Sequence, residues 1–170
     1  YSKDGKRWER SAEPLKWPTG DTGNFFYDSQ DSDRRRRVKV YGQNGGGYGP
    51  DIEHLKPVTT HTMITPGEGR EREIHFTYVI PYRGYYIMLY DLNLWQPFYG
   101  ARGLVKIRNE QKRGAEGGIY IGDIRLAVCR DGLGKFERIQ AHQPVVERGE
   151  RGTWDSGFLV LGGGSGIIHN

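Results

Sequence analysis

The segment from residue 72 to residue 92, REIHFTYVIPYRGYYIMLYDL, constrains the fold more than any other part of the chain. In its first half, large apolar side chains occupy every second position: Ile74, Phe76, Tyr78 and Ile80. A period of two predicts that these side chains share one face of a half-buried β-strand. The stretch PYRG, residues 81–84, predicts a four-residue turn, and the alternation resumes after it. The segment therefore predicts an antiparallel hairpin.

The remaining sequence indicates more strands and no amphipathic helix. Segments that predict strands occur at residues 24–27, 37–41, 57–65, 102–109, 119–130, 135–140, 144–147 and 157–162. The 26 glycines and 8 prolines are spread along the chain without a repeat, as many tight turns require. The glycine-rich stretch at 42–51 predicts a loop, and Gly122 predicts a bulge inside the strand at 119–130. This pattern predicts an all-β fold, a two-sheet antiparallel β-sandwich of jelly-roll or immunoglobulin-like type.

The length and composition predict one domain over residues 1–170. A chain of this length buries roughly two thirds of its unfolded surface and needs no disulfide to fold, and it has a single cysteine, Cys129. Residues 1–23 predict an irregular segment or an edge strand, and residues 162–170 predict a glycine-rich tail. No apolar stretch approaches the ~20 residues of a membrane helix, so we expect a soluble protein without a membrane span. The start at Tyr1 suggests a processed extracellular chain or an excised domain, and it leaves the compartment open.

A block of charged residues around the start of the strand at 37–41 raises the question of an anionic partner. It contains three aspartates and then four consecutive arginines: Asp28, Asp31, Asp33, Arg34, Arg35, Arg36 and Arg37. One interpretation is a solvated loop in which the two signs partly neutralise each other. The other is a contact in which the arginines bind an anion or an acidic protein partner. The aspartate spacing also suits part of an irregular calcium loop, although the adjacent arginines disfavour a cation.

Aromatic residues in segments predicted as loops form the main candidate binding site. The candidate ligand-binding residues combine aromatic rings with polar side chains: Trp95, Gln96, Tyr99, Arg102, Asn44 and Tyr48. Large rings outside the core stack on sugars or anchor protein interfaces. The alternative is a small hydrophobic cluster that caps one end of the sandwich.

The sequence contains few features of an enzyme. Its five histidines are scattered, and neither G-x-S-x-G nor a zinc-binding spacing occurs. We therefore predict no catalytic residue, metal or cofactor and expect a non-catalytic module that recognises a carbohydrate or a protein surface. The main alternative is a self-assembling structural or coat-type protein, a homo-oligomer in which the arginines contact an acidic neighbour. Further alternatives are binding of nucleic acid or a heparin-like polymer, which the net charge of +4 permits, and a sandwich glycosidase or lyase activity.

Overall fold

The computed structural model covers most of the chain. The described residues are 2–10, 16, 18, 23–43, 45–58, 63–69, 71–97, 118–150 and 152–161, with the backbone alone for residues 72, 95–97 and 118–120. Within these ranges the chain forms eight β-strands, one short 3-10 helix and two four-stranded sheets. All strand pairs within the sheets are antiparallel. The predicted all-β class and the two-sheet antiparallel sandwich are confirmed.

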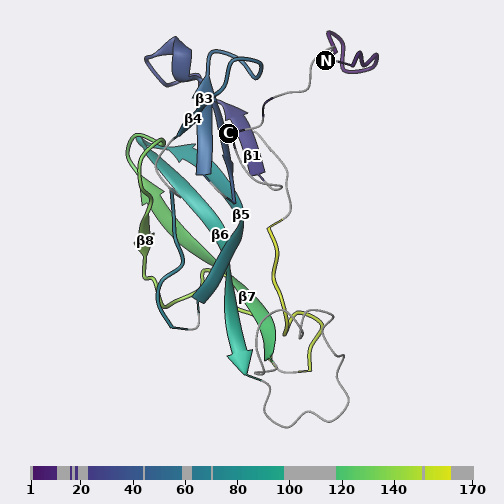
Figure 1. Cartoon of the computed structure of the whole chain (residues 1–170), viewed down its shortest axis with the longest axis vertical. Coiled ribbons are helices and arrows are strands. Elements are labelled where there is room, and N and C mark those ends of the chain that lie inside the picture. Colours follow the sequence, from purple (N-terminus) through teal and green to yellow (C-terminus); the bar gives the residue numbers. More distant parts are fainter. Residues whose placement is uncertain are drawn as a thin grey trace.

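Consecutive strands are neighbours in both sheets (Figure 1). Sheet A contains β1 (Gly23–Tyr27), β2 (Val38–Gly42), β3 (Gly45–Gly49) and β4 (Lys56–Val58), with the 3-10 helix η1 (Arg34–Arg36) between β1 and β2. Sheet B contains β5 (Glu71–Tyr82), β6 (Tyr85–Pro97), β7 (Gly118–Cys129) and β8 (Glu137–Ile139). The strand at 102–109 and the glycine-rich tail at 162–170 that the sequence predicts lie outside the described residues.

The predicted hairpin is present as β5 and β6, but its turn is shorter than expected. Tyr82 pairs with Tyr85, which leaves only Arg83 and Gly84 in the turn, so the prediction of a four-residue turn is wrong. Both turn residues have positive φ, 47° for Arg83 and 80° for Gly84, as a two-residue type I′ turn requires. Because the twist of such a turn matches the twist of the strands, pairing continues to the tip of the hairpin.

A bulge in β5 changes which side chains face the core. The register shifts between Ile74 and Thr77, so the alternation restarts after the shift. Ile74 and Val79 are buried, whereas Ile80 is 41% exposed. The prediction that Ile74 and Ile80 share one face is therefore wrong, because an unbroken period of two takes no account of the extra residue.

The glycine-rich stretch that was predicted as a loop forms β3. A Cβ atom at Gly46 would lie 2.9 Å from Sδ of Met63, and one at Gly47 would lie 2.7 Å from Cγ of Pro18. Adjacent residues of a strand point to opposite faces, so both faces of sheet A are closely covered here. The prediction of a loop is wrong for this strand, because the glycines leave room for side chains that pack directly on its backbone.

The hydrophobic core draws on both sheets and on the segments between the strands. Its buried members are Tyr41, Met63, Ile64, Ile74, Val79, Met88, Tyr90, Leu92, Ala127, Cys129 and Phe136. Tyr41 of β2 stacks on Phe26 with 5.9 Å between ring centroids and meets Phe136 edge-on at 6.1 Å. The Tyr41 hydroxyl donates to the carbonyl oxygen of Gly132 at 2.8 Å. Tyr41 therefore joins sheet A to the loop between β7 and β8.

Candidate functional site

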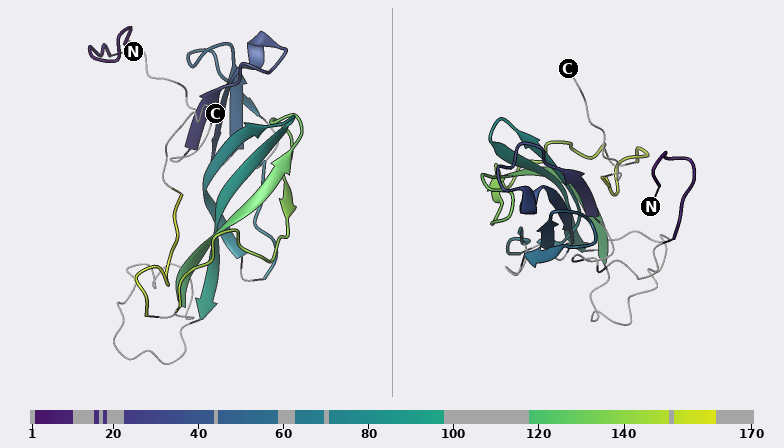
Figure 2. Two further views of the ribbon diagram at one scale, coloured as in Figure 1. Left: turned by 180° about the vertical axis from the view of Figure 1, so that it is seen from behind. Right: turned by 90° about the horizontal axis from the view of Figure 1, so that it is seen from above.

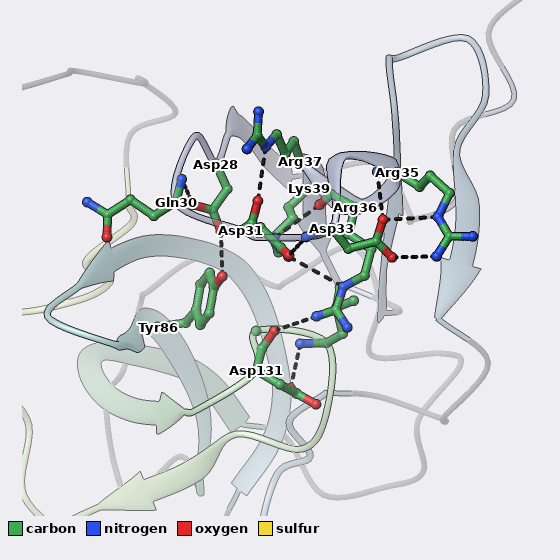
Figure 3. A network of polar contacts seen from close by, with 12 residues as sticks. Asp28, Gln30, Asp31, Asp33, Arg35, Arg36, Arg37, Lys39, Tyr86 and Asp131 are labelled. Atoms are coloured by element: carbon green, nitrogen blue, oxygen red, sulfur yellow. Dashed lines mark hydrogen bonds and ion pairs between the residues drawn. The ribbon is translucent and has the colours of Figure 1, made fainter.

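One buried lysine organises the loop between β1 and β2 (Figure 3). Lys39 of β2 is fully buried, and its Nζ donates to Oδ2 of Asp28 at 2.9 Å and to Oδ2 of Asp31 at 2.7 Å. Nζ also donates to the carbonyl oxygen of Arg36 at 3.0 Å and lies 5.3 Å from the centroid of the Tyr86 ring. The three acceptors match the three protons of the ammonium, so the buried charge is satisfied.

The spacing of the aspartates explains the path of the loop. Oδ1 of Asp28 accepts the amide of Gln30 at 3.1 Å. In the same way, Oδ1 of Asp31 accepts the amide of Asp33 at 2.9 Å. Asp33 caps η1, since its Oδ1 accepts the amide of Arg35 at 3.0 Å. Each aspartate therefore closes a turn over the amide two residues further on, which short acidic side chains favour.

The network fixes the protonation states of its members. Burial acts to raise the pKa of Asp28, but hydrogen bonds from Tyr86 and Lys39 outweigh burial and hold this pKa below its usual value. Burial and the hydrogen bond to Asp28 raise the pKa of Tyr86. The hydrogen bond from Arg35 lowers the pKa of Asp33 to about 2. At neutral pH these aspartates are therefore anionic and Tyr86 is neutral.

The loop is neutralised internally, as one interpretation expected, but it is not simply solvated. Asp28 is 2% exposed, and the side chain of Asp31 is 9% exposed. A calcium ion at this position would need their carboxylate oxygens, which the Lys39 ammonium binds instead. The described part of the chain contains no group of three or more side chains suited to hold a metal ion. The aspartate spacing therefore serves the fold of the loop.

Two of the four arginines are paired inside the loop. Nε of Arg35 lies 3.0 Å from Oδ1 of Asp33, in an ion pair at the surface. Nε of Arg36 lies 3.4 Å from Oδ2 of Asp31. Arg36 also donates to the carbonyl oxygen of Asp131 at 3.3 Å, which connects the loop to the start of the β7–β8 connection. Arg35 and Arg36 therefore make ion pairs within the loop, and Arg36 also joins the loop to the β7–β8 connection.

The other two arginines have no carboxylate partner among the described residues. Arg34 is exposed at the start of η1. Arg37 donates to the carbonyl oxygen of Asp31 at 3.0 Å and to the hydroxyl of Tyr27 at 3.4 Å. The positive charges of Arg34 and Arg37 are therefore not offset by an ion pair with these carboxylates.

The tip of the β5–β6 hairpin lies at the same end of the molecule as η1 (Figures 1 and 2). The hydroxyl of Tyr86 donates to Oδ2 of Asp28, which ties the hairpin to the loop. At the tip itself, Tyr82 and Tyr85 are cross-strand partners on either side of the turn. Because Tyr86 faces the loop, the adjacent Tyr85 and its partner Tyr82 point to the other face of sheet B.

Arginines lie over both of these tyrosines. The guanidinium of Arg83 lies 5.4 Å from the centroid of the Tyr82 ring. The guanidinium of Arg130 lies 4.4 Å from the centroid of the Tyr85 ring, and its Nη2 donates to the Tyr85 hydroxyl at 2.6 Å. Stacking of this kind restrains both partners, because the cation is attracted to the face of the ring.

We call these exposed side chains at the tip of the hairpin the arginine–tyrosine surface: Tyr82, Arg83, Tyr85 and Arg130. Its rings are accessible, with exposed fractions of 54% for Tyr82 and 38% for Tyr85. The surface therefore presents two aromatic rings, each with a guanidinium over it.

The candidate binding residues from the sequence do not gather at one described site. Trp95 and Gln96 lie in β6, so the prediction that they occupy a loop is wrong. Tyr48 lies in β3, a strand that contacts η1. The candidates whose side chains lie outside the description are Trp95, Gln96, Asn44, Tyr99 and Arg102. Their role in binding stays a prediction.

The sequence analysis did not single out Tyr82, Tyr85 or Arg130 as candidate binding residues. A local signal exists for the two tyrosines, because residues on either side of a two-residue turn are cross-strand partners. No local signal exists for Arg130. It reaches Tyr85 because Tyr86 pairs with Cys129, a contact between strands that are far apart in the sequence.

Comparisons with known proteins add no functional assignment. In the described part of the chain, no helix is both long and apolar enough to cross a membrane. No protein-family model matches the sequence, and the searches of curated proteins and of solved structures gave no match either.

Proposed function

We propose that this chain is a non-catalytic binding module that recognises the surface of another protein. The recognition site is the arginine–tyrosine surface. One observation carries the proposal: two exposed tyrosines, Tyr82 and Tyr85, are each stacked against an arginine at the tip of a tight hairpin. Tyrosine and arginine are enriched among the residues that dominate the binding energy of protein interfaces.

The rigidity of this surface supports a role in binding. Tyr82 and Tyr85 sit at the ends of paired strands, and Arg130 holds the Tyr85 hydroxyl at 2.6 Å. Association costs free energy whenever flexible side chains become ordered at an interface. Side chains that are already restrained before binding lose less conformational entropy, so more of the contact energy appears as affinity.

The arginine stacking favours a protein partner over a carbohydrate. A sugar binds an aromatic residue through an open ring face. Here a guanidinium already lies over the rings of Tyr82 and Tyr85, at 5.4 and 4.4 Å from their centroids. The guanidinium covers one face of each ring, and the arginine forks add hydrogen-bond donors beside the rings, which suits the mixed polar and apolar surface of a protein.

The test compares two double variants in affinity capture from an extract of the source organism, followed by direct binding of the purified candidate partner. Tyr82→Ser with Tyr85→Ser removes the rings of the surface. Trp8→Ser with Trp154→Ser is the matched control, because these exposed rings, at 74% and 95% exposure, are not part of the surface. We expect the first variant to weaken binding at least about tenfold and the control to bind as the wild type does.

Three outcomes would contradict the proposal. Equal binding by both variants would remove the surface from recognition. Binding to a glycan panel that depends on Tyr82 and Tyr85 would assign the surface to carbohydrate. A large species in sedimentation velocity that the tyrosine substitutions dissolve would replace the proposal by self-assembly of this chain.

A further inference from the structure

The face of sheet B that points away from the core carries two complete rungs of side chains. Alternation places every second residue of a strand on this face, and the register of the three strand pairs aligns these residues across the sheet. The rung nearer the hairpin tip contains Ile80, Ile87, Val128 and Glu137. The next rung contains Tyr78, Leu89, Leu126 and Ile139. Seven of these eight side chains are apolar or aromatic, and we call these seven the apolar face.

The apolar face is accessible and is not part of the hydrophobic core. The positions that alternate with it, Val79, Met88 and Ala127, belong to the core instead. Ile80 is 41% exposed and Ile139 is 39% exposed, and the other five side chains are partly exposed. A sheet in a folded protein buries an apolar face against another layer. The exposure of this face therefore leaves apolar area for a second molecule.

The open area has defined limits. At the tip, Tyr82 and Tyr85 point to the same side and extend the face to the arginine–tyrosine surface. At the other end, the paired residues Asp91 and Ile124 are only 0% and 4% exposed. From strand and rung spacings, the open area measures roughly 20 by 20 Å, about 400 Å². This is about half of the ~800 Å² that each partner contributes to a standard interface, so the face suits one secondary-structure element better than a second copy of the whole chain.

The chemistry of the face restricts which element fits. The one charged residue of the two rungs is Glu137, on the edge strand β8, so a charged segment would bury its charges without partners. The backbone N–H and C=O groups of a sheet lie in its plane, and its face offers none of them to a ligand. An extended segment on this face would therefore bury its own backbone groups unpaired, which is costly. An α-helix satisfies its backbone internally.

From this complementarity we infer that the protein partner presents an amphipathic α-helix whose apolar side packs on the apolar face. The inference rests on the proposed function, because it names the element of the partner that lies beside Tyr82 and Tyr85. A helix is about 10 Å wide and rises 1.5 Å per residue, so about 14 residues span the open area. Its polar side stays in water.

The experiment measures binding of a fluorescently labelled helical peptide by anisotropy. The peptide has about 14 residues, with leucines along one side and equal numbers of glutamate and lysine on the other, and an i,i+4 lactam bridge on the polar side holds the helix. An isomer of the same composition, with the leucines distributed around the helix, is the control peptide. We expect the wild type to bind the first peptide at least about tenfold more tightly than the isomer. Added salt should not weaken binding, because the contact contains no ion pair.

Two variants locate the contact. Ile80→Thr with Ile139→Thr removes apolar area from both edge strands and keeps β-branched side chains in them. Trp8→Ser with Val145→Thr is the matched control, because these residues are 74% and 56% exposed and belong to neither rung. The face variant should bind the peptide about tenfold more weakly, and the control should match the wild type. Thermal unfolding of both variants should match the wild type, because the substitutions are on exposed side chains.

The outcomes separate the two proposals. Equal peptide binding by the face variant and the control would contradict the inference. A dimer that the face variant dissociates would assign the face to a second copy, and binding to phosphatidylcholine vesicles that the face variant loses would assign it to a lipid surface. If the Tyr82→Ser, Tyr85→Ser variant loses the captured partner while the face variant keeps it, the protein-binding function stands and the helix does not. If both variants keep the partner, both proposals fail.

Discussion

The aromatic ring of Phe158 lies directly over the backbone of Gly122. A Cβ atom at Gly122 would be 2.7 Å from two carbon atoms of this ring. The amide of Gly122 donates to the carbonyl oxygen of Gly157, and its carbonyl oxygen accepts the amide of Leu159, both at 3.2 Å. The segment around Phe158 therefore runs along β7 and depends on the missing side chain at Gly122.

We predict that Gly122→Ala destabilises the protein by about 1–3 kcal/mol, because the new methyl group must displace the Phe158 ring. Unfolding in urea measures the change. Gly157→Ala is the control, since nothing lies within 4 Å of a Cβ atom at that position, and it should change the stability by less than about 0.5 kcal/mol. The combination with Phe158→Ala should cost less than the sum of the single changes. Strict additivity would show that the ring and the glycine are not coupled.

Gly122 also shows how a local interpretation of the sequence can fail. A glycine inside a strand predicts a bulge, yet the register between β6 and β7 continues without a shift through Asn93 and Gly122. The glycine is needed for a contact with a residue far along the chain, and nothing next to it in the sequence reveals that contact. The alternating pattern of the β5–β6 hairpin, in contrast, is local, so the two strands could be predicted before their bulge was known.

Asn24 joins the edges of the two sheets. Its Nδ2 donates to the carbonyl oxygen of Val79 at 3.3 Å, and its Oδ1 accepts the amide of Val79 at 3.2 Å. Asn24→Ala leaves both backbone groups without this partner in a buried position. We predict a loss of about 3 kcal/mol in the free energy of unfolding, since each buried unsatisfied group costs about 1–3 kcal/mol.

The measurement is urea unfolding together with hydrogen exchange at the Val79 amide, which should exchange faster in the variant. Gln30→Ala is the control because this side chain is exposed, and it should leave both readouts unchanged. Wild-type protection at Val79 in the Asn24→Ala variant would contradict the bridging role.

Lys39→Met tests the buried network of the loop between β1 and β2. The substitution keeps the apolar stem but removes the ammonium, which leaves the carboxylates of Asp28 and Asp31 without their main counter-charge in a buried position. Breaking a buried ion pair from one side costs about 3–5 kcal/mol. We expect a loss of this size in urea unfolding at neutral pH.

Two further variants make this measurement specific. Lys56→Met removes an exposed lysine of β4 and should change the stability by less than about 0.5 kcal/mol. Asp28→Asn combined with Lys39→Met removes the stranded charge together with the lysine, so the double variant should be more stable than Lys39→Met alone. A double variant that is less stable would mean that the charge of Asp28 is stabilised by other groups.

The charge block illustrates which parts of a site a sequence can predict. The internal neutralisation of the loop follows from the local spacing of Asp31, Asp33 and the arginines, and it was predicted. The burial of Lys39 could not be predicted, because it depends on Tyr86 from the other sheet, which covers the ammonium. The pairing of Arg130 with Tyr85 has the same origin, since it requires the register between β6 and β7.

Asp91 of β6 is a fully buried acid that holds the bulge in β5. Its Oδ1 accepts the amides of His75 and Phe76 at 3.0 and 2.5 Å. Burial raises the pKa of Asp91 and outweighs the opposing effect of these two amides, while the charges of His75 and Glu73 act in opposite directions. Because the pKa is higher in the folded protein than in the unfolded chain, Asp91 contributes most to stability below its usual pKa of about 3.9. That contribution is lost as the pH rises through the raised value.

Asp91→Asn removes this titration, and its side-chain oxygen still accepts the two amides. We therefore predict that the stability of the wild type falls relative to Asp91→Asn as the pH is raised from about 4, as measured by urea unfolding at a series of pH values. Asp33→Asn provides the opposite sign. The pKa of Asp33 is lowered to about 2, chiefly by the hydrogen bond from Arg35, so its contribution is present above about pH 4 and is lost as the pH falls toward 2. A stability difference between wild type and Asp91→Asn that is independent of pH, or that grows in favour of the wild type, would show that Asp91 is not held by burial at a raised pKa.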